Sequence, residues 1–374
     1  MLPGPEVDLS KFAVVACDQH VSDPSYWEAV EAYVGDAPSA LRLMLPEAYL
    51  EQPDRALRVA GINAAMQEYL DRGLLREVGE GFVYLQRTIT TGVRHGLMMA
   101  LDLEQYDYTP GAKSLIRATE QTIPERLPPR VEIRRDAVLE LPHIMVLVDD
   151  PDNLLLGAVE QALPTLPRCY DFDLMQQSGH LTGWLVQEEE LLLRLADALK
   201  ILCERGEGLL FAMGDGNHSL ATAKACWEQQ KRTLSESERA THPARFALCE
   251  IVNLHDEAMV FEPIHRVLFS VDEKALERET GIRGDKMPPL QQLQPLLDAY
   301  LAAHPETRID YVHGEQAARD LGSKPGNLAL LMPPFDKSSL YDIVRHDGVL
   351  VRKSFSLGEA PDKRFYLEAR KITR

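Results

Sequence analysis

One helix–strand–turn–helix unit constrains this chain more than any other part of its sequence. The amphipathic segment 188–205 predicts a helix, the apolar run 209–213 predicts a strand, and segment 220–231 predicts a second helix. Further apolar runs predict strands near 12–16, 82–85, 142–148, 246–253 and 261–269, and segment 54–75 predicts another long helix. This alternation indicates an α/β or α+β protein with a mixed sheet.

The turn inside this unit, residues 214–219, has the composition of an anion site. Its residues are Gly214, Asp215, Gly216, Asn217, His218 and Ser219. Glycines permit the backbone to approach a ligand closely, and the amides at the start of a helix favour phosphate. A purely structural turn is the alternative, because strand–helix turns commonly hold Gly, Asp, Asn and Ser. His218 favours the functional interpretation, since a helix cap does not need it. The turn is neither a Walker loop nor a dinucleotide GxGxxG opening.

A second candidate group lies in the proline-containing segment 106–130, which predicts a long irregular loop. Arginine can bind phosphate through two hydrogen bonds, threonine can add a hydroxyl, and glutamate can act as a general base or bind magnesium through water. The candidates are Arg117, Thr119, Glu120, Thr122 and Arg126. The alternative is a surface loop with local ion pairs.

Three shorter patterns carry weaker signals. His265-Arg266 could reach an anionic substrate, although a single His on an apolar strand is more often structural. Cys17-Asp18 could form a nucleophile–acid pair, but no His lies in a telling position beside it. The consecutive residues 255–257, His-Asp-Glu, do not converge well on one metal ion, so we expect a polar loop there.

Composition limits which binding partners and which cellular compartment we expect for this protein. The net charge of −18 disfavours nucleic acid and anionic membranes, although segments 113–135 and 352–374 are locally basic and suit a small anion. No apolar run is long enough to span a bilayer, and the first twenty residues do not resemble a secretory signal. Five scattered cysteines without a CxxC motif fit a reducing compartment, so we expect a cytoplasmic protein.

At these residues the chain resembles the bacterial and archaeal family called domain of unknown function 1015. The resemblance rests on the stretches 13–19, 26–28, 114–120, 128–130, 140–143, 215–218, 261–266 and 353–359. The family's turn is similar to the phosphate-contacting turn of the ParB/sulfiredoxin-like fold, which includes ParB-type CTPases, sulfiredoxin and kinases of free serine. The resemblance implies that Asp215, Gly216 and His218 lie at a phosphate or nucleotide site, faced by Glu120 and Thr122.

The resemblance also suggests an organisation for the 374 residues. We expect an N-terminal strand and helices in 1–81 packing on a ParB/sulfiredoxin-like core in 82–270. A smaller C-terminal α/β subdomain would follow in 271–374.

The chain departs from the family's usual Asp-Gly-His-His-Arg turn at two positions. Asn217 stands where the first His is usual, and Ser219 stands where the Arg is usual. The missing arginine removes a fixed charge for phosphate, which Arg117, Arg126 or Arg266 would have to supply. The turn has no cysteine, which excludes sulfiredoxin chemistry, and the net charge disfavours a ParB role on DNA.

The sequence therefore predicts a phosphotransferase, like a kinase or phosphatase, acting on a small hydroxyl-bearing metabolite such as serine or phosphoserine. Glu120, Asp215 and His218 are the expected catalytic residues, and ATP or ADP with Mg²⁺ the expected cofactors. The alternative is a nucleotide-binding regulatory or adaptor protein without catalysis. The metal, the direction of the reaction and the oligomeric state stay open.

Overall fold

The structure is a computed structural model that describes residues 1–373, and it divides into two compact units. The first unit holds Met1–Met259 together with the chain from Glu359 onward, and the second holds Val260–Gly358. The chain thus leaves the first unit once and returns to it with its last residues.

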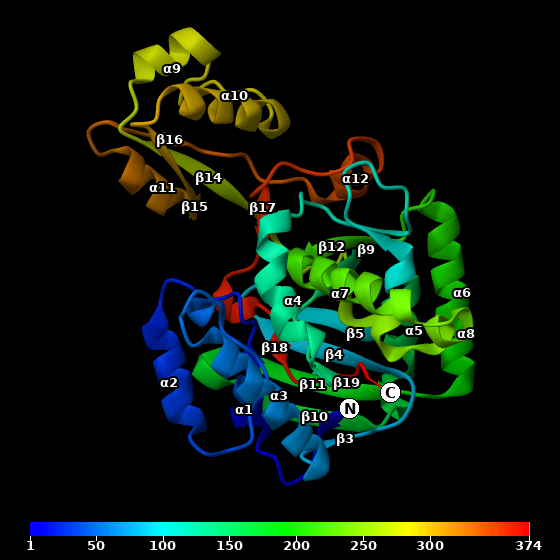
Figure 1. Cartoon of the computed structure of the whole chain (residues 1–374). Helices are drawn as coiled ribbons and strands as arrows, with labels where there is room; N and C mark the ends of the chain where they lie inside the picture. Colours follow the sequence, from blue (N-terminus) through cyan, green and yellow to red (C-terminus); the bar gives the residue numbers. More distant parts are fainter. Residues whose placement is uncertain (374) are drawn as a thin grey trace. The chain divides into compact units, whose positions relative to one another are not determined.

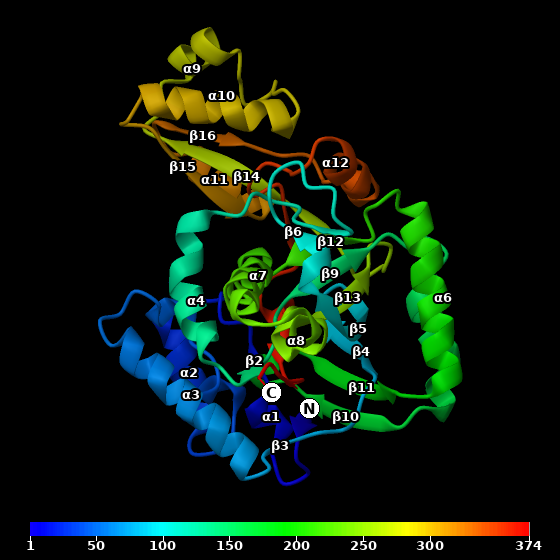
Figure 2. The same ribbon diagram turned by 45° about the vertical axis from the view of Figure 1, so that its right-hand side comes forward.

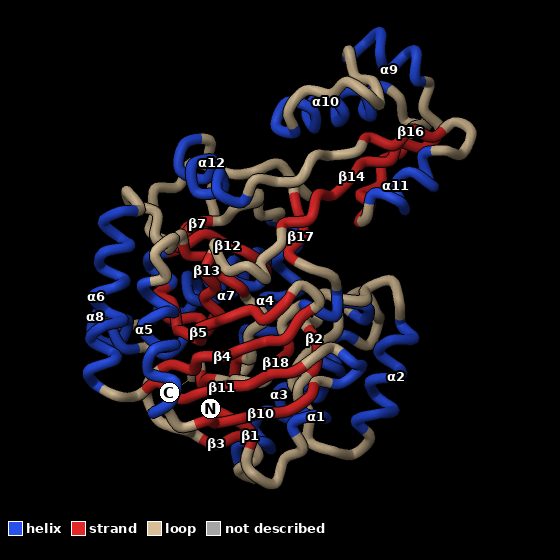
Figure 3. The backbone as a smooth tube through the Cα atoms, turned by 180° about the vertical axis from the view of Figure 1, so that it is seen from behind, coloured by secondary structure: helices blue, strands red, loops and turns tan. Residues whose placement is uncertain are grey.

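A nine-stranded mixed sheet forms the centre of the first unit (Figure 3). Its strands in spatial order are β10 (Arg168–Asp173), β11 (His180–Val186), β4 (Phe82–Ile89), β5 (Gly92–Asp102), β13 (Phe246–Asn253), β9 (Met145–Val148), β12 (Phe211–Asp215), β7 (Ile116–Arg117) and β6 (Tyr106–Asp107). Pairing is antiparallel from β10 through β13, then β13 pairs in parallel with β9, and β12 with β7. The mixed α/β class expected from the sequence is confirmed.

Helices cover this sheet and supply its core. They are α1 (Leu9–Phe12), α2 (Pro24–Val34), α3 (Arg55–Asp71), α4 (Leu127–Arg135), α5 (Leu154–Ala162), α6 (Glu189–Arg205), α7 (Asn217–Gln230) and α8 (Glu236–Thr241). In Figure 2, α6 and α7 lie on opposite sides of the central strands. The N-terminal helices bury Val30, Ile62 and Met66 in one apolar cluster with Leu85 of β4, so this part packs on the sheet.

Three short strand pairs join the ends of the chain to the first unit. They are β1 (Leu2–Pro3) with β3 (Leu75–Arg76), β2 (Val14–Val15) with β18 (Phe365–Tyr366), and β8 (Leu139–Glu140) with β19 (Arg370–Lys371). The Met1 ammonium donates to the Ala369 carbonyl at 2.6 Å, which places the two ends side by side (Figure 1). The C-terminal segment is therefore an integral part of this unit.

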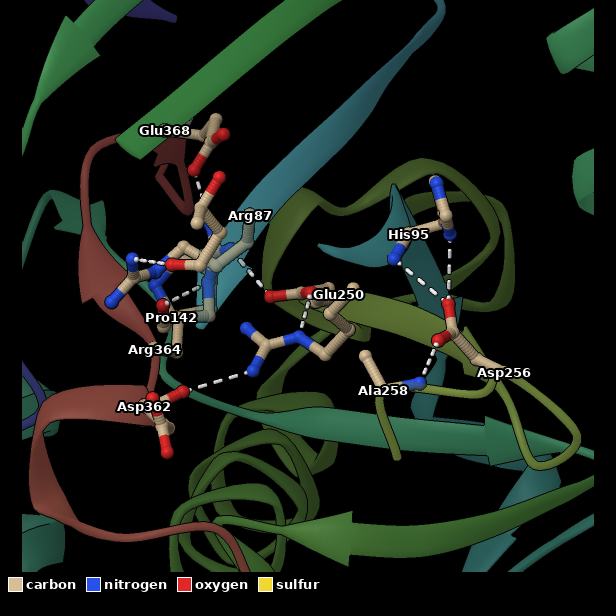
Figure 4. Close-up of polar contacts among 11 residues, drawn as sticks. Arg87, His95, Pro142, Glu250, Asp256, Ala258, Asp362, Arg364 and Glu368 are labelled. Carbon is tan, nitrogen blue, oxygen red and sulfur yellow. Dashed lines mark hydrogen bonds and ion pairs between the residues drawn. The ribbon is translucent and has the colours of Figure 1, made fainter. Parts of the chain in front are cut away.

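A buried cluster of opposite charges fastens that segment to the sheet (Figure 4). Glu250 of β13 is fully buried and accepts hydrogen bonds from Arg94 at 3.1 Å and from Arg364 at 2.7 Å. Arg364 also pairs with Glu368 and donates to the Pro142 carbonyl at 3.0 Å. Because each charge has an opposite partner, the cost of burying it is offset. The cluster fixes the backbone on either side of Arg364.

The second unit is a small α/β fold. Strand β14 (Phe261–Phe269) pairs with β15 (Arg308–His313), β16 (Asn327–Leu330) and β17 (Phe355–Leu357). The helices are α9 (Glu273–Thr280), α10 (Leu290–Ala303), α11 (Glu315–Gly322) and α12 (Leu340–His346). Leu268, Leu276, Leu293 and Leu297 are among its core residues.

The two units do not follow the expected boundaries at 81 and 270. Strand β14 belongs with the second unit because all its partners lie there, and the last residues belong with the first because they pair with β2 and β8. The loop expected at 106–130 also differs, since α4 begins at Leu127. Pro128 and Pro129 occupy its first turn, where no N–H donor is required. Among residues 1–373, no helix is long and apolar enough to cross a membrane.

Candidate functional site

The turn between β12 and α7 is the centre of the candidate site. Strand β12 ends at Asp215, and Gly216 adopts the left-handed conformation (φ 74°, ψ 29°) before α7 begins at Asn217. A side chain at position 216 would meet the Ile144 Cα at 3.0 Å, so the turn needs glycine for both its backbone angles and its space. The helix starts three residues before the expected position, and it includes Asn217, His218 and Ser219 in its first turn.

The first two amides of α7 have no hydrogen-bond acceptor among the described residues. The Ser219 and Leu220 N–H groups donate to the Gly216 carbonyl at 2.9 and 3.1 Å. Across residues 1–373, no hydrogen bond uses the backbone N–H of Asn217 or His218. Unpaired amides at a helix start and the helix dipole together favour an anion at this position.

The loop that carries Glu120 is held against this helix end. The Asn217 side-chain amide donates to the Glu120 carbonyl and to the Thr122 hydroxyl, each at 3.2 Å. The Ile123 N–H donates to His218 Nε2 at 3.3 Å, and the Thr119 hydroxyl donates to the Met213 carbonyl at 2.8 Å. The structure thus brings together the turn and the loop that were singled out separately in the sequence.

Asp215 is engaged on both carboxylate oxygens. Oδ1 accepts from the Gly216 N–H at 2.8 Å, and Oδ2 forms a 2.9 Å ion pair with Lys363 of the C-terminal segment. Burial alone would raise the pKa of Asp215, but Lys363 and the Gly216 amide hold it below its ordinary value. Asp215 is therefore an anion that positions Lys363 beside the turn.

His218 is neutral at physiological pH. Burial, followed by the charges of Arg130 and Arg126, lowers its pKa to about 4. Since Nε2 accepts the Ile123 amide, the neutral ring carries its proton on Nδ1. The charges of Arg126 and Arg130 therefore act on this end of α7 even though position 219 holds serine.

A hydrogen-bonded chain leads from the turn into the protein. Ser219 Oγ lies 2.9 Å from His143 Nε2, and His143 Nδ1 lies 2.6 Å from the Tyr366 hydroxyl. The Cys17 N–H donates to that hydroxyl at 3.2 Å. Burial raises the pKa of Tyr366 well above its ordinary value, so the phenol stays protonated.

Other predicted residues are engaged elsewhere. Arg117 is buried and donates to the carbonyls of Ser114 and Gly208, each at 2.8 Å, so its charge serves the loop. His265 and Arg266 lie in the second unit; His265 accepts the Met332 N–H at 3.0 Å, and Arg266 donates to Gln294 at 3.2 Å. A role for Arg117, His265 or Arg266 in a phosphate site stays a prediction.

The weaker patterns also have structural partners. Burial, with Asp18 nearby, raises the pKa of the Cys17 thiol far above neutrality, which disfavours a thiolate nucleophile. His255 lies 2.7 Å from Asp149, whereas Asp256 lies 3.0 Å from His95 (Figure 4). The two side chains therefore face different partners.

Sequence reasoning missed four residues of the site: Arg130, His143, Lys363 and Tyr366. Lys363 and Tyr366 are more than 140 positions from the turn, and only pairing of β18 with β2 brings them back. The signal that was available is the basic excess of segments 113–135 and 352–374, which contain Arg130 and Lys363.

Comparison with known proteins gives a family and weak structural similarities. One solved structure is a free serine kinase variant in complex with AMP (TM-score 0.38, 10% identity, 76% of this chain and 94% of that chain). Another is a free serine kinase variant with ADP (TM-score 0.39, 9% identity, 74% and 92%). A third is a conserved hypothetical protein from Pyrococcus furiosus (TM-score 0.33, 11% identity, 74% and 95%).

No curated protein matches the sequence. The family described as "Protein of unknown function (DUF1015)" matches residues 2–286, which is most of the chain. The chain therefore belongs to this family.

Proposed function

We propose that this protein binds ATP or ADP by its phosphates at the start of α7. It transfers a phosphoryl group between the nucleotide and the hydroxyl of a small metabolite, such as serine or phosphoserine. One observation carries the proposal: the Asn217 and His218 amides have no protein acceptor among residues 1–373, while Asn217 holds the Glu120 loop beside them. A ParB/sulfiredoxin-like core in a cytoplasmic protein is part of this proposal, and the five free cysteines are consistent with that compartment.

The charge that phosphate requires comes from residues outside the turn. Lys363 is held at the turn by Asp215, and Arg126 and Arg130 act on His218 electrostatically. Arg130 is paired with Glu47, so Arg126 and Lys363 are the cations proposed to replace the arginine that the family usually has at position 219. Because its pKa is about 4, His218 is neutral above that pH. The neutral ring can still donate one hydrogen bond to a phosphate, through Nδ1–H.

Glu120 is the proposed general base in the kinase direction. It takes the proton of the acceptor hydroxyl while that oxygen forms a bond to the γ-phosphorus and the bond to the ADP oxygen breaks. The rest of the catalysis consists of positioning the two substrates and stabilising the negative charge of the transferred phosphoryl group, because phosphoryl transfer requires little covalent chemistry from the protein.

The residues at the turn do not fit a protein-held Mg²⁺. Asp215 uses both oxygens for Gly216 and Lys363, and within the described chain no group of three ligands converges at the turn. Magnesium prefers octahedral oxygen ligands and often binds through substrate phosphates. The proposed transfer therefore uses only the nucleotide, the acceptor and the protein's own side chains and amides.

Calorimetry and turnover together test the proposal. Purified protein is titrated with ATP and ADP, with and without Mg²⁺, and assayed with serine and phosphoserine as substrates. Glu120→Gln should keep nucleotide affinity within about threefold and lower turnover by about 100-fold or more. Glu125→Gln, on the exposed part of the same loop, is the matched control and should retain both.

Two results would contradict the proposal. Absence of nucleotide binding in the wild-type protein would refute the site itself. Binding without turnover that Glu120→Gln leaves unchanged would instead favour the regulatory or adaptor alternative.

A further inference from the structure

A pocket of about 150 Å³ lies directly behind the candidate turn, within the first unit. Much of its wall is apolar and includes Leu43, Leu45, Met66, Ile133, Ala137 and Leu141. Ser219 and Thr222 of α7 also line it, so the pocket and the proposed phosphate site share one helix end. An apolar cavity of about this size holds a benzene-sized molecule.

The polar part of the wall can bind a hydroxyl group. Ser219, His143 and Tyr366 all line the pocket and form one hydrogen-bonded chain. When His143 carries its proton on Nδ1, the Ser219 hydroxyl donates to Nε2 and its oxygen can accept from a ligand. In the other neutral form, Nε2 donates to Ser219, whose hydroxyl can donate to a ligand. Either form leaves Ser219 one further hydrogen bond.

The charges in the wall are already neutralised by one another. Arg130 pairs with Glu47, and Arg134 pairs with Glu140 at 2.6 Å, while Arg370 adds a second contact to Glu140 at 2.7 Å. A zwitterion such as free serine would have to break these pairs or bury its own charges uncompensated. Both are costly, whereas an uncharged molecule requires neither.

We propose that this pocket binds a small, uncharged, largely apolar molecule whose single hydroxyl group hydrogen-bonds to Ser219. The inference rests on the proposed function, because it makes that hydroxyl the phosphoryl acceptor. It keeps a small hydroxyl-bearing acceptor but replaces serine and phosphoserine with an uncharged alcohol or phenol. Apolar contact with the wall holds the body of the molecule, and the Ser219–His143–Tyr366 chain orients its oxygen towards the start of α7.

Phenol and benzene are matched probes for this pocket, because they differ by one hydroxyl group. Their binding to the full chain is measured by ligand-observed NMR, with L-serine as a competitor. Wild-type protein should bind both saturably, and L-serine should displace neither. Ser219→Ala should weaken phenol about 3- to 10-fold and leave benzene within twofold, since it removes one hydrogen bond and little volume.

A cavity-filling variant gives the second test. Ala137→Leu adds volume to the pocket wall and should weaken both probes at least tenfold. Ala240→Leu, on the exposed face of α8, is the matched control and should bind them as the wild type does. Tryptophan fluorescence confirms folding of each variant, since Trp27, Trp184 and Trp227 all lie in the first unit.

The outcomes separate this inference from the proposed function. No saturable binding of phenol, displacement by L-serine, or equal binding by Ala137→Leu would overturn the pocket assignment. ADP binding is measured on the same samples. If the wild-type protein binds phenol but not ADP, the proposed function is refuted and the pocket assignment stands.

Discussion

Replacing Arg364 by methionine tests how the C-terminal segment is held at the site. The side chain is 3% exposed and makes ion pairs with Glu250 and Glu368, plus a hydrogen bond to the Pro142 carbonyl. Methionine fills much of the same space but provides no donor. The change therefore leaves two buried carboxylates with one fewer cation.

The expected cost follows from burial. Removing one partner of a buried ion pair costs about 3–5 kcal/mol, because the remaining charge is left uncompensated. Glu250 keeps Arg94, at 3.1 Å, which places the expected loss towards the lower end of that range. The melting temperature should fall by on the order of 10 °C.

Urea unfolding followed by tryptophan fluorescence measures this loss, because the three tryptophans report on the first unit only. Arg72→Met is the matched control. Its ion pair with Glu68 spans 2.6 Å, but both side chains are more than half exposed, so the cost should stay below about 1 kcal/mol. Equal losses for the two variants would refute the reasoning.

The pH dependence of the stability difference between wild type and Arg364→Met gives a second test. Burial alone would raise the pKa of Glu250, but Arg94 and Arg364 hold it below its ordinary value. Its ion pairs therefore stabilise the protein above the unfolded pKa of about 4.3, and this contribution is lost as pH falls. The difference between wild type and Arg364→Met should shrink from pH 7 to pH 4. A difference that grows on acidification would contradict the account.

Two further predictions concern the turn. The imidazole of His218 should titrate near pH 4 by NMR, and Arg130→Gln should raise that pKa. In the unfolded chain the ring binds its proton near pH 6.5. The stability contributed by the neutral, folded His218 is therefore complete above pH 6.5 and is lost as the pH falls towards 4. A midpoint above 6 would be inconsistent with this environment. Gly216→Ala should cost about 1–2 kcal/mol for its left-handed backbone, plus the contact with Ile144, and should weaken ADP binding. Gly111→Ala has φ near 79° but no neighbour within 4 Å, so urea unfolding should show a smaller loss; equal losses would count against the contact.

Local patterns predicted much of the fold. The helix expected at 188–205 is α6, the strand at 209–213 overlaps β12, and the apolar run 142–148 contains β9. Glycines follow α6 and flank the run 209–213, and Asp149-Asp150-Pro151 follows β9, so local sequence defines these elements. The start of α7 was placed late because the polar residues 217–219 were assigned to the turn, although they form the helix's first turn.

The candidate site was harder to predict from the sequence than the fold. The loop around Glu120 and the turn at 216–218 could be named because their residue types suit phosphate, and their bonds to one another are present in the structure. Lys363 and Tyr366 could not be placed, because no local pattern shows that β18 pairs with β2. Arg117 looked suitable by type alone, and only its hydrogen bonds show that the loop uses its charge.

Backbone amide NMR of the protein with ADP tests the central claim most directly. Saturable shifts of the Asn217 and His218 amide signals with ADP, and none with adenosine, are the expected result, because the phosphates supply the contact. If ADP leaves these two signals unchanged while it shifts others, or binds nowhere, the start of α7 is not a phosphate site.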